Sequence, residues 1–92
     1  MLQSKKEALP QYNVAVASND ETMGTVEING VDETATTVDL NTITTVKAAA
    51  KDGYRFTGWY EGSNLVSSDA EYSFRVRNNV SLTAKFELKP SI

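Results

Sequence analysis

The chain contains neither histidine nor cysteine, so any chemistry would have to come from carboxylates, lysines, hydroxyl groups and aromatic rings. Without an imidazole or a thiol, a nucleophilic site would need lysine or a carboxylate as its general base. The acids lie scattered at predicted turns, and none lies beside an apolar stretch that would favour a buried, catalytic carboxyl group. We therefore predict no catalytic residue, no cofactor and no enzymatic activity.

Two pairs of neighbouring acids are the candidates for a metal site. Asp20-Glu21 and Asp32-Glu33 would approach each other if the first two strands formed a hairpin. Calcium prefers such oxygen ligands, but a dedicated calcium loop repeats its acids at every second position. These pairs lack that spacing, so we interpret them as solvated turn charges and predict no metal site.

Three aromatic rings on one short segment, Tyr54, Trp59 and Tyr60, are the candidates for contact with a partner. Flat rings stack on sugars and anchor protein interfaces. The alternative is that Trp59 packs in the core while the two tyrosines cover its edge. Phe56 and Trp59 lie three residues apart, so they share a face only if Gly58 between them hosts a β-bulge.

The composition fits one small domain and excludes several classes of partner. Ninety-two residues with 40% hydrophobic residues can bury one modest core. The net charge of −3, without clustered lysine and arginine, argues against nucleic acid. No run approaches the ~20 apolar residues that cross a bilayer, so we predict no direct membrane insertion. The first residues lack an apolar core and do not resemble a signal peptide.

Alternation of apolar and polar residues predicts a mostly β fold, a small antiparallel β-sheet module with short turns. We expect a linker or flexible N-terminus over residues 1–11, one β-rich domain over 12–88 and a C-terminal tail over 89–92. The expected strands are 12–17, 24–28, 35–40, 43–50, 55–61, a brief pairing at 65–66, 72–77 and 80–88. We expect hairpins between the first two strands and, through Asn78-Asn79, between the last two.

Residues 31–45 are the most ambiguous stretch. Their many threonines are β-branched, which favours a short strand near 35–40. A single helical turn near residues 39–42 is the alternative, so we expect at most one short helical turn within 32–42. The predicted core, taken from inward positions of the strands, consists of Val14, Val16, Val26, Phe56, Trp59, Tyr72, Phe74, Leu82 and Phe86.

Four short elements follow one another in a recognisable order and spacing. They are Gly24-Thr25-Val26, Val46-Lys47-Ala48-Ala49-Ala50-x-x-Gly53-Tyr54-x-Phe56-x-Gly58-Trp59, Tyr72-x-Phe74-x-Val76 and Leu82-Thr83-Ala84-x-Phe86. This order resembles the divergent InlB B-repeat domain over roughly residues 12–87. The chain departs from the commonest pattern of that family in its longer stretch over 31–42.

The resemblance implies a non-catalytic module of bacterial cell-surface or secreted multidomain proteins. The related internalin B repeat has a β-grasp-like sheet, whereas members of the divergent family need not keep its helix. It implies an extracellular location on the cell surface or cell wall, with secretion and anchoring signals outside these residues. The expected role is a spacer or adhesin-type repeat that contacts neighbouring domains of the same chain. The alternative is a module that binds a host protein or glycan through Tyr54, Trp59 and Tyr60. A third interpretation is an intracellular β fold unrelated to this family.

Overall fold

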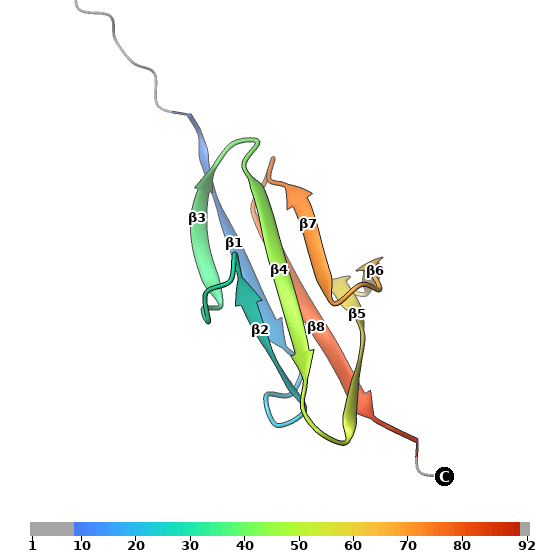
Figure 1. The fold of residues 1–92 in the computed structure, drawn as a ribbon. Coiled ribbons are helices and arrows are strands. Elements are labelled where there is room, and N and C mark those ends of the chain that lie inside the picture. Colours follow the sequence, from blue (N-terminus) through green and yellow to red (C-terminus); the bar gives the residue numbers. More distant parts are fainter. Residues whose placement is uncertain (1–8, 91–92) are drawn as a thin grey trace, which may run out of the picture.

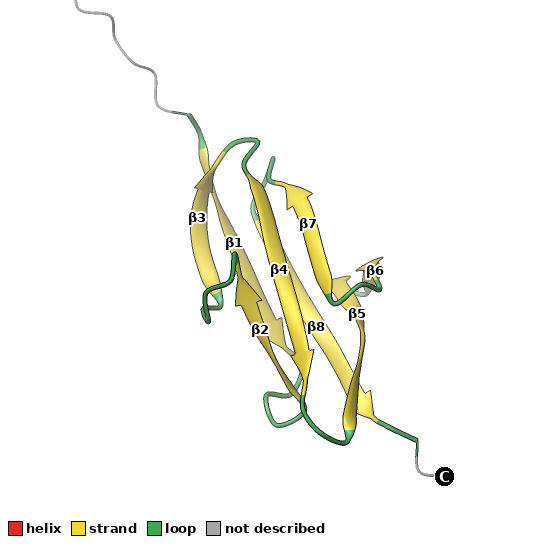
Figure 2. Cartoon of the chain, viewed as in Figure 1, coloured by secondary structure: helices red, strands yellow, loops and turns green. Residues whose placement is uncertain are grey.

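The computed structural model describes residues 9–90, which form eight strands and no helix (Figures 1 and 2). The strands are β1 (Gln11–Ser18), β2 (Gly24–Ile28), β3 (Ala35–Asp39), β4 (Ile43–Ala50), β5 (Tyr54–Glu61), β6 (Asn64–Ser67), β7 (Glu71–Arg75) and β8 (Val80–Leu88). The predicted β class is therefore confirmed. Residues 1–8 of the expected linker and 91–92 of the expected tail lie outside the described residues, and β1 begins at Gln11, the last residue of that linker.

The strands form two sheets that pack face to face (Figure 1). Sheet A has five strands in the order β3-β1-β8-β5-β6, and sheet B has three in the order β2-β4-β7. The pairing of β1 with β8 is parallel, whereas the other ladders are antiparallel. Within the part of the chain that the structure describes, sheet B covers sheet A without help from a helix.

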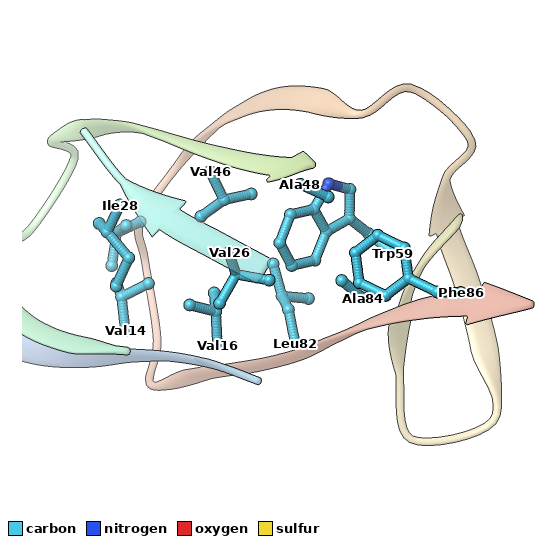
Figure 3. Close-up of a cluster of buried hydrophobic side chains, with 11 residues drawn as sticks. Val14, Val16, Val26, Ile28, Val46, Ala48, Trp59, Leu82, Ala84 and Phe86 are labelled. Carbon is cyan, nitrogen blue, oxygen red and sulfur yellow. The ribbon is translucent and has the colours of Figure 1, made fainter. Parts of the chain in front are cut away.

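Buried side chains from both sheets form a single core, and Figure 3 shows most of them. Each strand contributes alternate residues, as period two requires. The buried apolar residues are Val14, Val16, Val26, Ile28, Val46, Ala48, Trp59, Val76, Leu82, Ala84 and Phe86. Of the predicted core, Phe56, Tyr72 and Phe74 are half-buried and pack against this cluster, and the rest is fully buried.

Both expected terminal hairpins are wrong. β1 pairs with β3 and β8, and β2 pairs with β4 in the other sheet. Likewise β7 pairs with β4, while β8 lies in sheet A. The alternation shows which face of a strand turns inward, but it does not show which strand lies beside it. The connections 19–23 and 76–79 cross from one sheet to the other, which lets the two apolar faces meet.

The ambiguous stretch contains the strand β3, as its β-branched residues predict, and the helical alternative is wrong. The chain reverses after β3 through Asn41, which adopts a left-handed φ of 70°. Asparagine tolerates this conformation better than most residues. The predicted turn at Asn29-Gly30 is confirmed, with φ values of 52° and 80° and a bridge between Ile28 and Val31.

β8 is the central strand of sheet A. It lies between β1 and β5, as its long alternation predicts. Chain entry and exit lie at opposite ends of the sandwich, because β1 and β8 run in the same direction (Figure 1). No helix among the described residues could span a membrane.

Candidate functional site

A β-bulge in β5 decides where the candidate aromatic rings point. Phe56 pairs with Phe86, but the register then shifts and Gly58 pairs with Lys85. Thr57 is the extra residue, and its hydroxyl donates to the carbonyl of Lys85 at 3.0 Å. As a result Phe56 and Trp59 share the inner face, with ring centroids 5.8 Å apart in an edge-to-face arrangement. The bulge interpretation of the sequence is therefore confirmed.

Trp59 is fully buried between the sheets (Figure 3). Its indole Nε1–H donates to the carbonyl oxygen of Ala70 at 3.1 Å. The same oxygen accepts the amide of Ala48 at 2.9 Å, so one carbonyl joins the β4–β7 ladder to the tryptophan. A buried indole needs such a partner, and this one also fixes the ring. Trp59 has no surface left for a ligand.

Tyr60 lies on the outer face of sheet A, beside residues that were not among the predicted contact residues. Lys85 on β8 places its Nζ 4.1 Å from the centroid of the Tyr60 ring, a cation–π contact. Leu65 on β6 lies opposite Tyr60 and is 54% exposed. A Cβ on Gly58 would meet the Leu65 side chain, so the glycine leaves room for it. We call Tyr60, Leu65 and Lys85 the Tyr60 surface.

Tyr54 is separated from the Tyr60 surface. It begins β5 opposite Leu88, and its side chain lies on the same side of the strand as Phe56. Six positions along a strand correspond to about 20 Å. The bulge puts Tyr60 on the opposite face. The structure therefore does not gather Tyr54, Trp59 and Tyr60 into one patch.

The acidic pairs flank a hollow between the β1–β2 and β2–β3 connections. The hollow measures about 250 Å³ and is lined by Ser18, Glu21, Thr25, Val26, Asp32 and Thr34. Glu21 and Asp32 thus lie near each other although β1 and β2 form no hairpin. No three potential metal ligands of the His, Cys, Asp or Glu type cluster anywhere in residues 9–90.

Asp20, the neighbour of Glu21 in the first acidic pair, serves the turn after β1. Its Oδ1 accepts the hydroxyl of Thr22 at 2.6 Å and the amide of Thr22 at 2.9 Å. The hydroxyl bond, followed by the amide bond, lowers the pKa of the Asp20 carboxyl. Because these bonds stabilise the ionised form, Asp20 is a turn residue and a poor proton donor at neutral pH.

Asn19 is a second residue that sequence reasoning missed. Its backbone amide donates to the carbonyl of Ala84 at 2.9 Å. Its side chain then pairs with both backbone groups of Phe86, at 2.9 and 3.2 Å. Asn19 therefore continues the β1–β8 ladder beyond the end of β1. No local signal in the sequence separates Asn19 from an ordinary turn asparagine. The position of Lys85 could have been predicted, because alternation along β8 places its side chain on the outer face, where the bulge also places Tyr60.

Comparison with known proteins agrees with this architecture. The family model of the divergent InlB B-repeat domain matches residues 13–90, from within β1 to just beyond the end of β8. No curated protein and no solved structure matches the chain. The match covers both sheets, the β5 bulge and the central β8 strand. This chain belongs to the divergent InlB B-repeat domain family.

Proposed function

We propose that this domain is a non-catalytic, tension-bearing spacer in a bacterial cell-surface or secreted multidomain protein. It would contact neighbouring domains of the same chain at its two ends and hold another domain away from the surface. Membership in a cell-surface repeat family supports the location. The observation that carries the mechanical role is the parallel pairing of β1 with β8 at the centre of sheet A.

Parallel neighbours at the two ends of a chain resist pulling in a particular way. Tension drags β1 and β8 past each other along their length, because force enters at one end of the sandwich and leaves at the other (Figure 1). The ladder runs from Val14 opposite Val80 to Ser18 opposite Ala84. Its hydrogen bonds lie across the direction of force and share the load, so they must break together rather than one by one.

The residues around this ladder support the same role. Asn19 extends the ladder with its amide and side-chain bonds to Ala84 and Phe86. On the inner face, Val14 and Val16 pack beside Leu82 in the core. Moving β1 along β8 would therefore also break these apolar contacts. The absence of histidine and cysteine from the sequence supports a role without catalysis.

Single-molecule force spectroscopy in two pulling geometries tests this proposal. A pair of engineered cysteines at Pro10 and Lys89 loads the β1–β8 pair in shear. A pair at Pro10 and Asn78 pulls on the starting ends of both strands and opens the same ladder one bond at a time. The chain has no cysteine of its own, so handles attach only at these positions. We expect a higher unfolding force in the shear geometry, because the bonds then share the load.

The Asn19→Ala variant sharpens the test. It removes the side-chain bonds to Phe86 and should lower the unfolding force in shear more than in the opening geometry. Asp69→Ala is a control at the exposed turn between β6 and β7, outside both strands of the ladder. Equal unfolding forces in the two geometries would rule out a load-bearing role for this pairing.

A second candidate is a binding module that uses the Tyr60 surface for a host protein or glycan. The exposed Leu65, the half-buried Tyr60 ring and the adjacent Lys85 ammonium support it, because rings, apolar groups and cations recur in binding surfaces. Amide and side-chain NMR shifts during titration with glycans or host proteins test it. Shifts that centre on Tyr60 and disappear in Tyr60→Ala would favour binding. If no ligand causes a shift, the spacer role is the one candidate function that remains.

A further inference from the structure

β7 forms one edge of sheet B, and its outer row of backbone groups has no strand beside it. The amide of Ala48 donates to Ala70, and the amide of Val76 donates to Thr42. Even-numbered residues along β7 therefore turn their backbone groups towards β4, and the odd-numbered ones face away. The amides and carbonyls of Glu71, Ser73 and Arg75 thus point outward, available to another strand.

The side chains of β7 are arranged antisymmetrically about Ser73. Glu71 and Arg75 lie two positions on either side of it, both exposed on the outer face of sheet B. Tyr72 and Phe74 lie one position on either side, half-buried on the inner face, with their rings stacked at 5.3 Å. If β7 is compared with its own sequence in reverse order, each charged residue faces a residue of the opposite charge and each aromatic residue faces another aromatic residue.

No other edge strand in the described residues has this property. β2 carries a single charge, Glu27, and β3 carries a single charge, Asp39. β6 carries none. A strand with one charged residue, or none, cannot form two equivalent ion pairs with a copy of itself. The self-complementary pattern is therefore specific to β7.

From this geometry we propose that β7 docks a second copy of this chain, edge to edge and antiparallel, about a two-fold axis through Ser73. Ser73 then exchanges both backbone hydrogen bonds with Ser73 of the second copy. Glu71 lies opposite Arg75 of the second copy, and the reverse pair forms on the other side of the axis. Residues directly opposite in an antiparallel pair are within reach of an ion pair.

The aromatic residues complete the fit on the inner face. Tyr72 lies opposite Phe74 of the second copy, so the two stacked pairs join into one row of four rings along the seam. Cross-strand aromatic pairs are among the stabilising contacts of antiparallel sheets. The two three-stranded halves become one continuous six-stranded sheet, with every outward backbone group of β7 paired.

The same charges discourage other pairings. A charged residue at an edge usually repels a foreign strand, and a shift of register by two residues in either direction separates Glu71 from Arg75 of the second copy on both sides of the axis. A two-fold contact also uses the same edge in both copies, so assembly stops at the dimer. The contact goes beyond the spacer role, since it joins neighbouring molecules side by side, and it holds or fails independently of the pulling geometry.

Sedimentation equilibrium over a concentration series tests the proposal. A contact of one short strand per copy predicts a weak, transient dimer, with a dissociation constant on the order of 10 μM to 1 mM. For the natural sequence we expect the apparent mass to rise from 10.1 kDa towards twice that value. The rise should weaken with added salt, because exposed ion pairs are screened.

Charge-reversal variants identify the edge. Glu71→Arg gives two arginines and Arg75→Glu gives two glutamates, so each variant alone should remain monomeric. Mixed together they should form a heterodimer, because every opposed pair is again attractive. The double variant Glu71→Arg with Arg75→Glu restores self-complementarity and should dimerise like the natural chain. Circular dichroism confirms that each variant is folded, and both side chains are exposed, so folding should persist.

Glu21→Arg is the matched control, since it makes the same charge change at an exposed turn that leads into β2, the opposite edge of sheet B. It should dimerise as the natural chain does. The proposal is overturned if the natural chain stays monomeric at about 1 mM. It is also overturned if the mixture of single variants fails to associate, or if the control loses dimerisation as completely as Glu71→Arg.

Discussion

Thr44 provides the sharpest test of the packing. It is fully buried on the inner face of β4, opposite Phe74, and its Oγ1 has no hydrogen-bond partner. A buried hydroxyl without a partner destabilises a fold by about 1–3 kcal/mol, because it loses its bonds to water. Thr44→Val replaces the hydroxyl by a methyl group of similar size and keeps the β-branched shape that suits a strand.

We expect Thr44→Val to raise the free energy of unfolding by about 1–2 kcal/mol. For a domain of this size, that gain corresponds to an increase in Tm of about 4–16 °C. Urea titration followed by the fluorescence of Trp59 measures the change, since that ring is the only indole and lies in the same core. The denaturant slope should stay constant, because the substitution exposes no new surface.

The neighbouring residue supplies the control. Thr45 lies on the outer face of the same strand, and its hydroxyl is hydrogen-bonded to the hydroxyl of Ser73 at 2.7 Å. Thr45→Val should change stability by no more than about 0.5 kcal/mol, or lower it slightly. If Thr44→Val lowers the free energy of unfolding, the hydroxyl has a partner in solution and the reasoning fails.

Four further outcomes follow from the core and the first turn. Gly24→Ala should destabilise by about 1–3 kcal/mol, because a Cβ there would lie 2.7 Å from Cδ1 of the buried Phe86 ring; an unchanged urea midpoint would show that the ring can move. Phe86→Ala should cost about 3–5 kcal/mol in chemical denaturation, and a loss below about 1 kcal/mol would contradict its inward position. Trp59 should emit at short wavelength and resist acrylamide quenching, whereas ready quenching would contradict its burial. In an NMR titration, Thr22→Ala should raise the pKa of Asp20 towards its ordinary value; since the folded-state pKa is lowered, the stabilisation it confers is present at neutral pH and is lost as pH falls through that pKa.

Strand positions could be predicted because their cause is local. Burying one face of a strand requires an apolar residue at every second position, and Leu82, Ala84 and Phe86 show this directly. The turn at Asn29-Gly30 could also be predicted from the sequence, since both residues accept a positive φ. The spacing of Phe56 and Trp59 predicted that the two rings share a face only if a bulge lies at Gly58, and the structure contains this bulge.

Partner strands could not be predicted in the same way, because pairing depends on contacts between residues far apart in the chain. Either terminal hairpin would have satisfied the alternation in β1, β2, β7 and β8. Burying the apolar faces of both sheets against each other required these connections to cross the core instead. The same crossings left β1 beside β8, and they set β7 at an open edge.

Sequence alone determined the family, the β class, the inward residues and the absence of imidazole and thiol chemistry, because each depends on residue types and short spacings. Tertiary structure decided that Trp59 is buried while Tyr60 faces outward beside Lys85. It also decided that the first and last strands lie side by side in parallel and that β7 forms an open edge. These properties follow from sheet order, and sheet order is set by the joint burial of two apolar faces rather than by any one segment.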